Sequence, residues 1–472
     1  MLKRFLLILM ILVFSGSLAF AELSKGDLTI AGYFKDEFSL GLKTFNEVSK
    51  FKNILQLSGE YKFSDQTAFF TSAKYWYDSV YDLREKYDVA QHYMGHIQRT
   101  DWLRDCYLDY TSGPWFLRLG KQQVSWGQSD GIAILDRVNP VDLTEFWLPD
   151  AVDLRVPLWM ANINYSPKLN SNLQLLIIPD FEQSTAAPPG APFAFRSYKK
   201  FMDFKERWES SGWYAGYPPP FLRGDVNVNI YYPAKQLENT KVGLQWQDRI
   251  GDWDYALNYL YGYDYLARTY AEKPDSIPPL DANYGRRFKL VQMAGGSLNH
   301  TFTEEGLLKG ITLRGDAAVY LNEPTYYGTV ATAKSEGVNR WNNVFWLVGL
   351  DKSVVTNWLA SFQFAQYIME HKSPGVGNFQ TLNSYTYGAQ DAVENIFSLK
   401  ISTDFLHERL KPEILWSWTD DNQGRISPKA TYEINDNLWF TLGIHYFYGK
   451  EVDSNGQFRD VSQFYTQIKY AF

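Results

Sequence analysis

Short segments in which apolar and polar side chains alternate recur along almost the whole chain. Residues 253–263, for example, place Trp253 and Tyr255 on one face and Asp254 on the other. A period of two is that of a β-strand with one apolar face, and roughly nine to eleven residues let a tilted strand cross a membrane. We expect such strands at 27–42, 53–63, 253–263 and 437–448, and others that begin near 67, 102, 115, 159, 172, 241, 289, 312, 343, 358, 395, 410, 425 and 462.

The connections between these segments alternate in length. Short ones such as 64–65 and 251–252 are separated by long ones such as 126–157 and 181–240. Transmembrane barrels have short turns on the periplasmic side and long loops on the outer side. We therefore predict an all-β, antiparallel up-and-down transmembrane β-barrel of about 18 strands, with 16–20 compatible with the pattern. A soluble β-sandwich is the alternative, but it has no reason to segregate its loops by length.

The two ends of the chain carry the patterns of an exported barrel. Residues 1–21 combine the basic Lys3 and Arg4 with an apolar run and a small-x-small site at 19–21, as in a cleaved signal peptide. The last strand, QFYTQIKYAF, stops at Phe472 and resembles the C-terminal assembly signal of outer-membrane barrels. We expect residues 22–472 to form a single barrel domain in the outer membrane, inserted by the barrel-assembly machinery.

Composition excludes several other classes of protein. The formal net charge of −7 argues against a nucleic-acid binder, which needs a basic face. Cys106 is the only cysteine, so neither a disulfide framework nor a thiolate metal site is available, and we expect no cofactor. The histidines lie in no recognisable nucleophile motif, and His445 falls on the predicted lumen face. We therefore predict that the protein is not an enzyme; an outer-membrane phospholipase is the alternative in that class.

The inward face of the predicted strands is charged. Unpaired charges in a dry core would be costly, so we predict a water-filled lumen. Neighbouring strands that pair these charges to stiffen the wall are compatible with the same pattern. The two signs are balanced, which argues against strong selectivity from the wall itself. The predicted wall residues are Lys35, Glu37, Glu60, Lys62, Arg118, Arg314, Asp316, Lys429 and Glu433.

The connection at 126–157 is the third long outer loop, the one that narrows the channel in trimeric general porins. Its residues Ile134 and Leu135 could pack against the wall, and its acids outnumber its bases, which favours cations in a narrow throat. A loop packed on the outer rim is the alternative. For the longest connection, 181–240, a lid, a ligand site and a subunit shield all stay open. The predicted constriction residues are Asp130, Asp136, Arg137, Asp142, Glu145, Asp150, Asp153 and Arg155.

A motif spans the end of one predicted strand and the start of this loop, in LRLGKQQVSWGQSDGIAILDRVNPVD at 117–142. Its residues are Gly120, Lys121, Gln122, Trp126, Gly127, Asn139, Pro140 and Asp142. The segment resembles an uncharacterised family of Gram-negative, porin-like outer-membrane barrels described only as a domain of unknown function. The resemblance implies an outer-membrane location and an association with export machinery for apolar compounds, and it brings no catalytic residues.

The functions compatible with these features are transport functions. A porin-like channel for diffusion or facilitated passage of small solutes, leaning towards cations, accounts for the wet lumen and the candidate constriction. The alternative is a barrel component of a multi-protein export or electron-transfer conduit. The expected partners are outer-membrane lipid, the assembly machinery, and either further copies in a homotrimer or components of such a conduit, and no nucleic acid.

Overall fold

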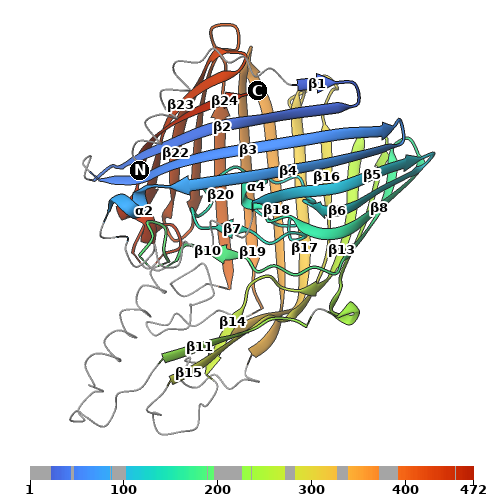
Figure 1. The fold of residues 1–472 in the computed structure, drawn as a ribbon, viewed down its shortest axis with the longest axis horizontal. Coiled ribbons are helices and arrows are strands. Elements are labelled where there is room, and N and C mark those ends of the chain that lie inside the picture. The colour runs from blue at the N-terminus through green and yellow to red at the C-terminus, as the bar shows by residue number, and fades with distance from the viewer. Residues whose placement is uncertain are drawn as a thin grey trace.

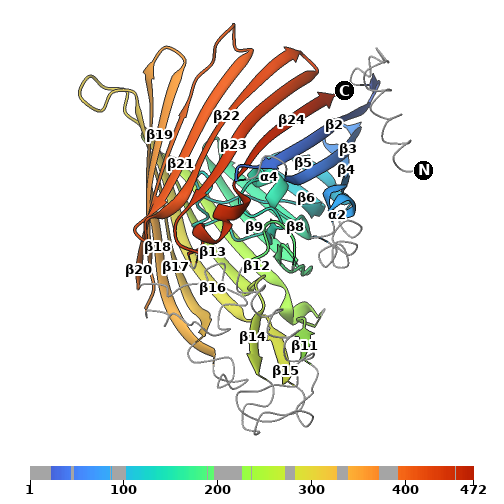
Figure 2. The same cartoon turned by 90° about the vertical axis from the view of Figure 1, so that its left-hand side faces the viewer.

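The computed structural model describes residues 23–43, 47–84, 87, 102–188, 190–195, 226–234, 236–271, 282–326, 338–370, 392–451 and 453–472. Within them, 18 strands form a closed antiparallel barrel (Figures 1 and 2). Each barrel strand pairs with the next one along the chain, and β24 (Gln463–Ala471) pairs with β2 (Leu28–Gly41) to close the ring. Beyond β24, Phe472 exchanges two backbone hydrogen bonds with Gly32, of 2.7 and 2.9 Å.

The predicted barrel fold is confirmed, and a strand lies at every segment where one was expected. The longest strands extend beyond the predicted bounds towards the loops, because the alternation continues there through charged residues. The other barrel strands are β3 (Val48–Ser64), β4 (Thr67–Asp78), β5 (Leu103–Ser112), β6 (Trp115–Gln122), β8 (Leu158–Lys168), β9 (Ser171–Ile178), β12 (Lys241–Ile250), β13 (Trp253–Tyr263), β16 (Leu290–Thr301), β17 (Ile311–Tyr326), β18 (Val338–Val355), β19 (Trp358–Ile368), β20 (Val393–Ser402), β21 (Leu410–Thr419), β22 (Gln423–Asn435) and β23 (Leu438–Tyr448).

Large apolar side chains cover the outside of the barrel. On β12, Leu244 and Trp246 are exposed on the outside, whereas Gln245 between them is buried and points inward. Leu55 and Leu57 on β3 are exposed in the same way. An apolar exterior with every backbone group paired in a closed ring is the arrangement that a hydrocarbon environment requires of a sheet.

Turns and loops are separated between the two ends of the barrel. The end at which β2 begins and β24 ends has mostly tight turns such as 65–66, although 302–310 and 403–409 are longer. The opposite end, which we call the loop end, carries the long connections, with short exceptions at 42–47 and 420–422. The predicted arrangement of short turns and long outer loops is therefore present with these four exceptions.

Short elements occupy the connections. β7 and β10 pair in parallel, and β11, β15 and β14 form a small separate sheet at the loop end (Figure 1). In the described part of the chain, no helix has the length and apolarity to cross a membrane. The predicted signal peptide and residues 198–221 of the long connection lie outside the described residues. The short elements are β1 (Leu23–Lys25), β7 (Asp142–Leu143), β10 (Thr185–Ala186), β11 (Val226–Tyr231), β14 (Arg268–Ala271), β15 (Ala282–Arg287), α2 (Val80–Leu83), α4 (Ala151–Leu154), η2 (Leu237–Asn239) and η3 (Gly456–Val461).

Candidate functional site

The connection between β6 and β8, residues 123–157, contacts the inner wall at distant strands, and we call it the inner loop. The Asp316 carboxylate on β17 accepts hydrogen bonds from the backbone N–H groups of Gln128 (2.9 Å) and Ser129 (3.0 Å). The Gln363 side chain on β19 accepts a bond from the Asp130 N–H (2.9 Å) and donates one to the Asp130 carbonyl (3.0 Å). Because Asp316 and Gln363 point inward, the inner loop reaches across the interior of the barrel.

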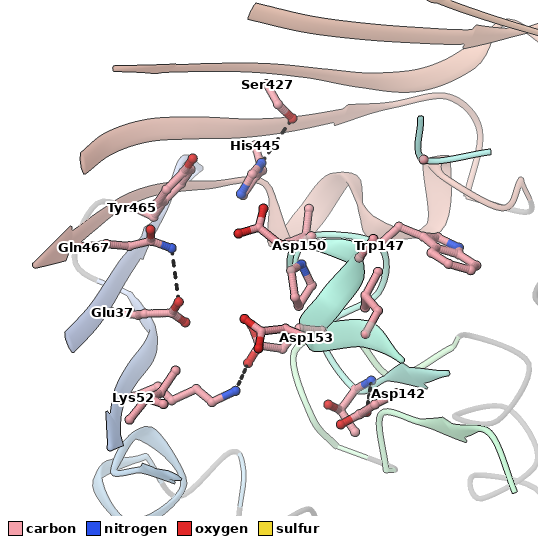
Figure 3. Close-up of a pocket in the computed structure, with 18 of the residues that line it drawn as sticks. Glu37, Lys52, Asp142, Trp147, Asp150, Asp153, Ser427, His445, Tyr465 and Gln467 are labelled. Atoms are coloured by element: carbon pink, nitrogen blue, oxygen red, sulfur yellow. Dashed lines mark hydrogen bonds and ion pairs between the residues drawn. The ribbon is translucent and has the colours of Figure 1, made fainter. Parts of the chain in front are cut away.

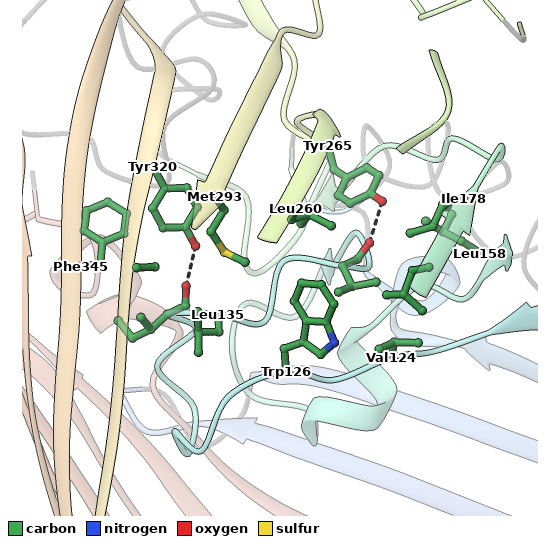
Figure 4. Close-up of a cluster of buried hydrophobic side chains, with 14 of the residues drawn as sticks. Val124, Trp126, Leu135, Leu158, Ile178, Leu260, Tyr265, Met293, Tyr320 and Phe345 are labelled. Atoms are coloured by element: carbon green, nitrogen blue, oxygen red, sulfur yellow. Dashed lines mark hydrogen bonds between the residues drawn. The ribbon is translucent and has the colours of Figure 1, made fainter. Parts of the chain in front are cut away.

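The first half of the inner loop packs on an apolar part of the wall. Ile134, Leu135 and Val138 are fully buried there (Figure 4). The Tyr320 hydroxyl donates to the Ile134 carbonyl (2.5 Å) and the Tyr265 hydroxyl to the Val138 carbonyl (2.7 Å). Burial of each large apolar side chain stabilises by roughly 1.5–3 kcal/mol, so this half is firmly anchored. Its buried apolar neighbours are Leu158, Met160, Leu176, Ile178, Leu260, Tyr265, Met293, Ala318, Tyr320, Phe345, Leu347 and Ala365.

Two glycines allow close approach between the inner loop and the wall. A Cβ at Gly243 on β12 would lie 2.9 Å from the Trp126 ring, whose Nε1 donates to the Gln174 Oε1 (2.9 Å). In the loop, Gly127 has a φ of +95°, and a Cβ there would lie 2.8 Å from the Asp316 carboxylate. Trp126 of the motif thus packs its ring against the wall. Gly127 lets the backbone that follows it approach the Asp316 carboxylate.

Asn139 of the motif ties the start of the inner loop to its end. Its Oδ1 accepts from the Val124 N–H (2.9 Å), and its Nδ2 donates to the carbonyls of Gln122 (3.3 Å) and Val156 (2.9 Å). The Val156 N–H in turn donates to the Pro140 carbonyl (2.8 Å). An amide side chain that satisfies three buried backbone groups explains why this turn is Asn-Pro.

The remaining motif residues also hold backbone in place. Gly120 has a φ of +137°, and a Cβ there would lie 2.1 Å from the Cys106 carbonyl oxygen on β5. Lys121 donates to the Leu103 carbonyl (2.8 Å). The Asp142 carboxylate accepts from the Thr185 hydroxyl (2.9 Å), next to the β7–β10 pairing.

The second half of the inner loop is held by ion pairs. Glu145 lies between Lys50 and Lys52 on β3, and its Oε1 is 2.6 Å from the Lys52 Nζ. Asp153 pairs with Lys74 on β4 at 2.5 Å. Burial alone would raise the pKa of the Glu145 carboxyl, but the two lysines outweigh burial, so its pKa lies well below its usual range. At neutral pH this half is therefore fixed to the wall by charge.

A further ion pair lies within the inner loop itself. Arg155 donates to the Asp136 Oδ2 through Nε (2.8 Å) and Nη2 (2.6 Å). Burial raises the pKa of Asp136 despite the lowering effect of Arg155. The Arg137 guanidinium lies 5.6 Å from the centre of the Tyr320 ring. These three predicted constriction residues serve the packing of the loop and do not line the cavity described next.

A cavity of about 890 Å³, which we call the lumen cavity, separates the second half of the inner loop from the wall. Strands β2–β6 and β19–β24 line the wall side, residues from 130 to 156 of the inner loop line the other, and Glu182, Gln183 and Thr185 also contribute. Glu37, His445 and Gln467 face Asp150 across it (Figure 3). The predicted constriction residues that line it are Asp130, Asp142, Glu145, Asp150 and Asp153.

An aromatic cluster adjoins the lumen cavity at Phe146, directly after Glu145. The Phe146 ring lies 4.6 Å from that of Phe458 in η3 and 6.0 Å from that of Phe447 on β23. Phe193 and Phe195 of the long connection are buried in the same cluster. The tip of the inner loop is thus joined to three other connections of the loop end.

The predicted wall residues fall into distinct groups. Lys35, Glu37 and Lys429 line the lumen cavity. Arg314 and Asp316 instead bind the inner loop, with an Arg314 donation to the Gln128 carbonyl at 2.5 Å. The inward face is therefore polar only in part, because strands β8–β19 present apolar side chains to the loop. The remaining predicted residues, which lie outside the cavity lining, are Glu60, Lys62, Glu433 and Arg118, the last paired with Asp109.

Several cavity residues were not identified from the sequence. Lys50 and Lys52 precede the predicted start of β3, although the alternation Lys50, Lys52, Ile54 continues the inward face and could have revealed them. Arg104 follows a register shift between β4 and β5. Its Nη2 donates to the carbonyls of Val152 and Arg155, both at 2.9 Å. Contacts of this kind leave no local sequence signal.

His445 lies in the lining of the lumen cavity beside Ser427 and Tyr465. The His445 Nδ1 lies 3.1 Å from the Ser427 Oγ, and its ring stacks on Tyr465 at 4.5 Å. In the described chain no carboxylate hydrogen-bonds to His445. Nor do the described residues contain a group of three or more His, Cys, Asp or Glu able to hold a metal ion.

Comparison with known families decides the relationship of the chain. A family model described as "Protein of unknown function (DUF1302)" matches residues 19–472. The chain belongs to the DUF1302 family. The resemblance carried by residues 117–142 is thereby confirmed. No curated protein sequence matches this DUF1302 chain.

Solved structures from Acinetobacter baumannii and Pseudomonas aeruginosa share this fold. OccAB1 of Acinetobacter baumannii superposes with a TM-score of 0.51 at 10% identity, over 95% of this chain and 96% of its own. OccK3 (OpdO) of Pseudomonas aeruginosa does so with a TM-score of 0.50 at 10% identity, over 94% and 96%. At this identity the likeness concerns the fold alone: the DUF1302 chain has the closed antiparallel β-barrel fold of these two structures.

Proposed function

We propose that this barrel is an outer-membrane channel whose solute path runs through the lumen cavity, with the inner loop as its constriction. The observation that carries the proposal is the division of the interior. The first half of the inner loop fills the apolar side, and the second half leaves about 890 Å³ between itself and a charged wall. A wide barrel narrowed by a packed loop is suited to passage of small polar solutes.

The acids of the inner loop predict a preference for cations, and we propose that this preference is weak. Glu145 and Asp153 are paired with lysines of the wall, so they contribute little field of their own, whereas Asp150 forms no such pair with the described residues. Opposite charges thus face each other across the cavity, and with nine bases against eight acids in its lining we infer that the lining favours neither sign strongly. The charged lining consists of Lys35, Lys50, Lys52, Lys74, Arg104, Lys121, Lys400, Arg425 and Lys429 against Glu37, Asp130, Asp142, Glu145, Asp150, Asp153, Glu182 and Glu413.

The test is single-channel recording in planar bilayers with purified, folded protein under a salt gradient. We expect stable conductance steps, and a larger conductance when residues 130–146 are deleted. An unchanged conductance after the deletion would remove the constriction from the proposal. Silence from a folded barrel would overturn the channel itself and favour the conduit that sheathes or receives a partner.

We further propose that the chain is exported by residues 1–21 and inserted through its C-terminal strand, which ends at Phe472. The outward apolar belt supports contact with outer-membrane lipid. A homotrimer and an export or electron-transfer partner are distinguishable by the mass of the complex extracted in mild detergent.

A further inference from the structure

Arg425 has different partners from most of the lysines that line the lumen cavity. It lies on the inward face of β22 and donates to the Trp147 carbonyl of the inner loop at 2.8 Å. Among the described residues no carboxylate lies within ion-pair distance of Arg425, whereas Lys35, Lys74 and Lys429 each have one. A guanidinium carries five N–H donors, so most of its hydrogen-bonding capacity faces the cavity.

Asp150 is the complementary case. Its carboxylate precedes α4, is exposed to the lumen cavity, and points towards His445 and Gln467 (Figure 3). No base of the described chain forms an ion pair with Asp150, although Glu145 and Asp153 on either side are both paired.

The two unpaired charges share one neighbourhood. Arg425 bonds to Trp147, three residues before Asp150, and Asp150 points towards His445 (Figure 3), which bonds to Ser427 on the same strand as Arg425. Tyr465 stacks on His445, and the surrounding lining consists of hydroxyl and amide side chains such as Ser427 and Gln463. An aromatic surface with few polar groups of opposite charge is the ordinary composition of a small-molecule site.

We propose that this part of the lumen cavity binds a small zwitterion, with its anionic group on the Arg425 guanidinium and its ammonium group on the Asp150 carboxylate. A simple anion would leave Asp150 without a partner, and a simple cation would leave Arg425 without one, each at a cost in desolvation. The proposal rests on the proposed channel function and names its substrate class.

The test uses the full-length barrel folded in detergent and three probes of equal chain length: 4-aminobutyrate, butyrate and butylammonium. Saturation-transfer NMR titrations give the Kd of each. We expect 4-aminobutyrate to bind about tenfold more tightly than either single-charge probe, in keeping with an additional charge-assisted hydrogen bond. Arg425→Gln should abolish the advantage over butylammonium, and Asp150→Asn the advantage over butyrate.

The control is Arg104→Gln. Arg104 also lines the lumen cavity and also donates to inner-loop carbonyls, but it lies near the Asp153 carboxylate. Its replacement should preserve the order of affinities. Equal affinity of the wild-type barrel for all three probes would overturn the proposal. An equal loss in Arg104→Gln and Arg425→Gln would do the same, because it would show that Arg425 acts through the position of the loop.

Binding in detergent requires no conduction, so the two proposals fail separately. A barrel that binds 4-aminobutyrate selectively and is silent in bilayers would retain the zwitterion site and lose the channel. A barrel that conducts and shows no preference among the probes would retain the channel and lose the site.

Discussion

Trp126 of the inner loop packs directly against Gly243 of the wall. The indole ring occupies the space that a Cβ on β12 would need, 2.9 Å away. The same ring donates to Gln174 on β9. The wall therefore leaves space for the loop, and the position of the loop depends on the residues of the wall as well as on its own residues.

Gly243→Val should dislodge the Trp126 ring. Forcing extra methyl groups into a packed contact costs roughly 1–3 kcal/mol, so the free energy of unfolding in urea should fall by that amount, and protease should cut within residues 123–157. The matched control is Gly59→Ala on β3, where a Cβ would meet nothing within 4 Å. Equal stability of the Gly243 variant and wild type would contradict the packing.

Asn139→Leu should release the two ends of the inner loop from each other. The substitution keeps the branched shape of the side chain but leaves the Val124 N–H and the Gln122 and Val156 carbonyls without their partner, at about 1–3 kcal/mol for each group left unsatisfied. Faster limited proteolysis of the loop, with barrel strands intact, is the expected readout. Asn172→Leu is the control, because Asn172 bonds only to side chains; equal proteolysis of both variants would count against the idea.

The barrel was predictable because the alternation in its strands is set by the membrane and needs no knowledge of partners. Residues 253–263 show this plainly, with Trp253 and Leu257 exposed on the outside. The apolar inner wall was less predictable. Met293, Tyr320 and Phe345 face inward, so their strands are apolar on both faces. Apolar side chains on the inward face indicate a part of the wall that a loop covers. The prediction from the sequence used the charged residues of the inward face and overlooked these apolar ones.

Only the inner-loop side of the site could be predicted from the sequence. The acids of residues 126–157 are visible in the sequence, but their partners are not. Glu145 meets Lys50 and Lys52 across more than ninety residues of chain, and Arg425 meets Trp147 across 278. Such pairings depend on how the loop crosses the barrel, which alternation along a strand does not specify.

Glu145→Gln should weaken the hold of the second half of the inner loop. Removing one partner of a buried ion pair costs about 3–5 kcal/mol, and the measurement is protease sensitivity of residues 140–157 together with open-channel noise in bilayers. The double-mutant cycle with Lys50→Met is the control: the double variant should lose less stability than the two single variants lose in sum. Strict additivity would show that the contact carries no coupling.

The same contact has a pH dependence of definite sign. The folded-state pKa of Glu145 lies below its usual value, so its stabilisation is present above the ordinary carboxyl pKa and is lost as pH falls through the depressed one. Wild-type protease resistance of the loop should therefore persist from pH 7 to about pH 5 and decline only in stronger acid. Glu145→Gln should lack this decline. Loss of wild-type resistance already near pH 6 would refute the ion pair as the anchor.

Asp150→Asn should lower the ratio of cation to anion permeability. Asp150 is an unpaired acid in the lumen cavity, and a carboxylate in a narrow passage raises the local concentration of cations. The measurement is the reversal potential under a salt gradient near 0.1 M, where screening acts over about 10 Å. Glu433→Gln, which removes an inward acid outside the cavity lining, is the matched control. If both variants shift the reversal potential equally, selectivity belongs to the summed charge of the wall and not to this passage.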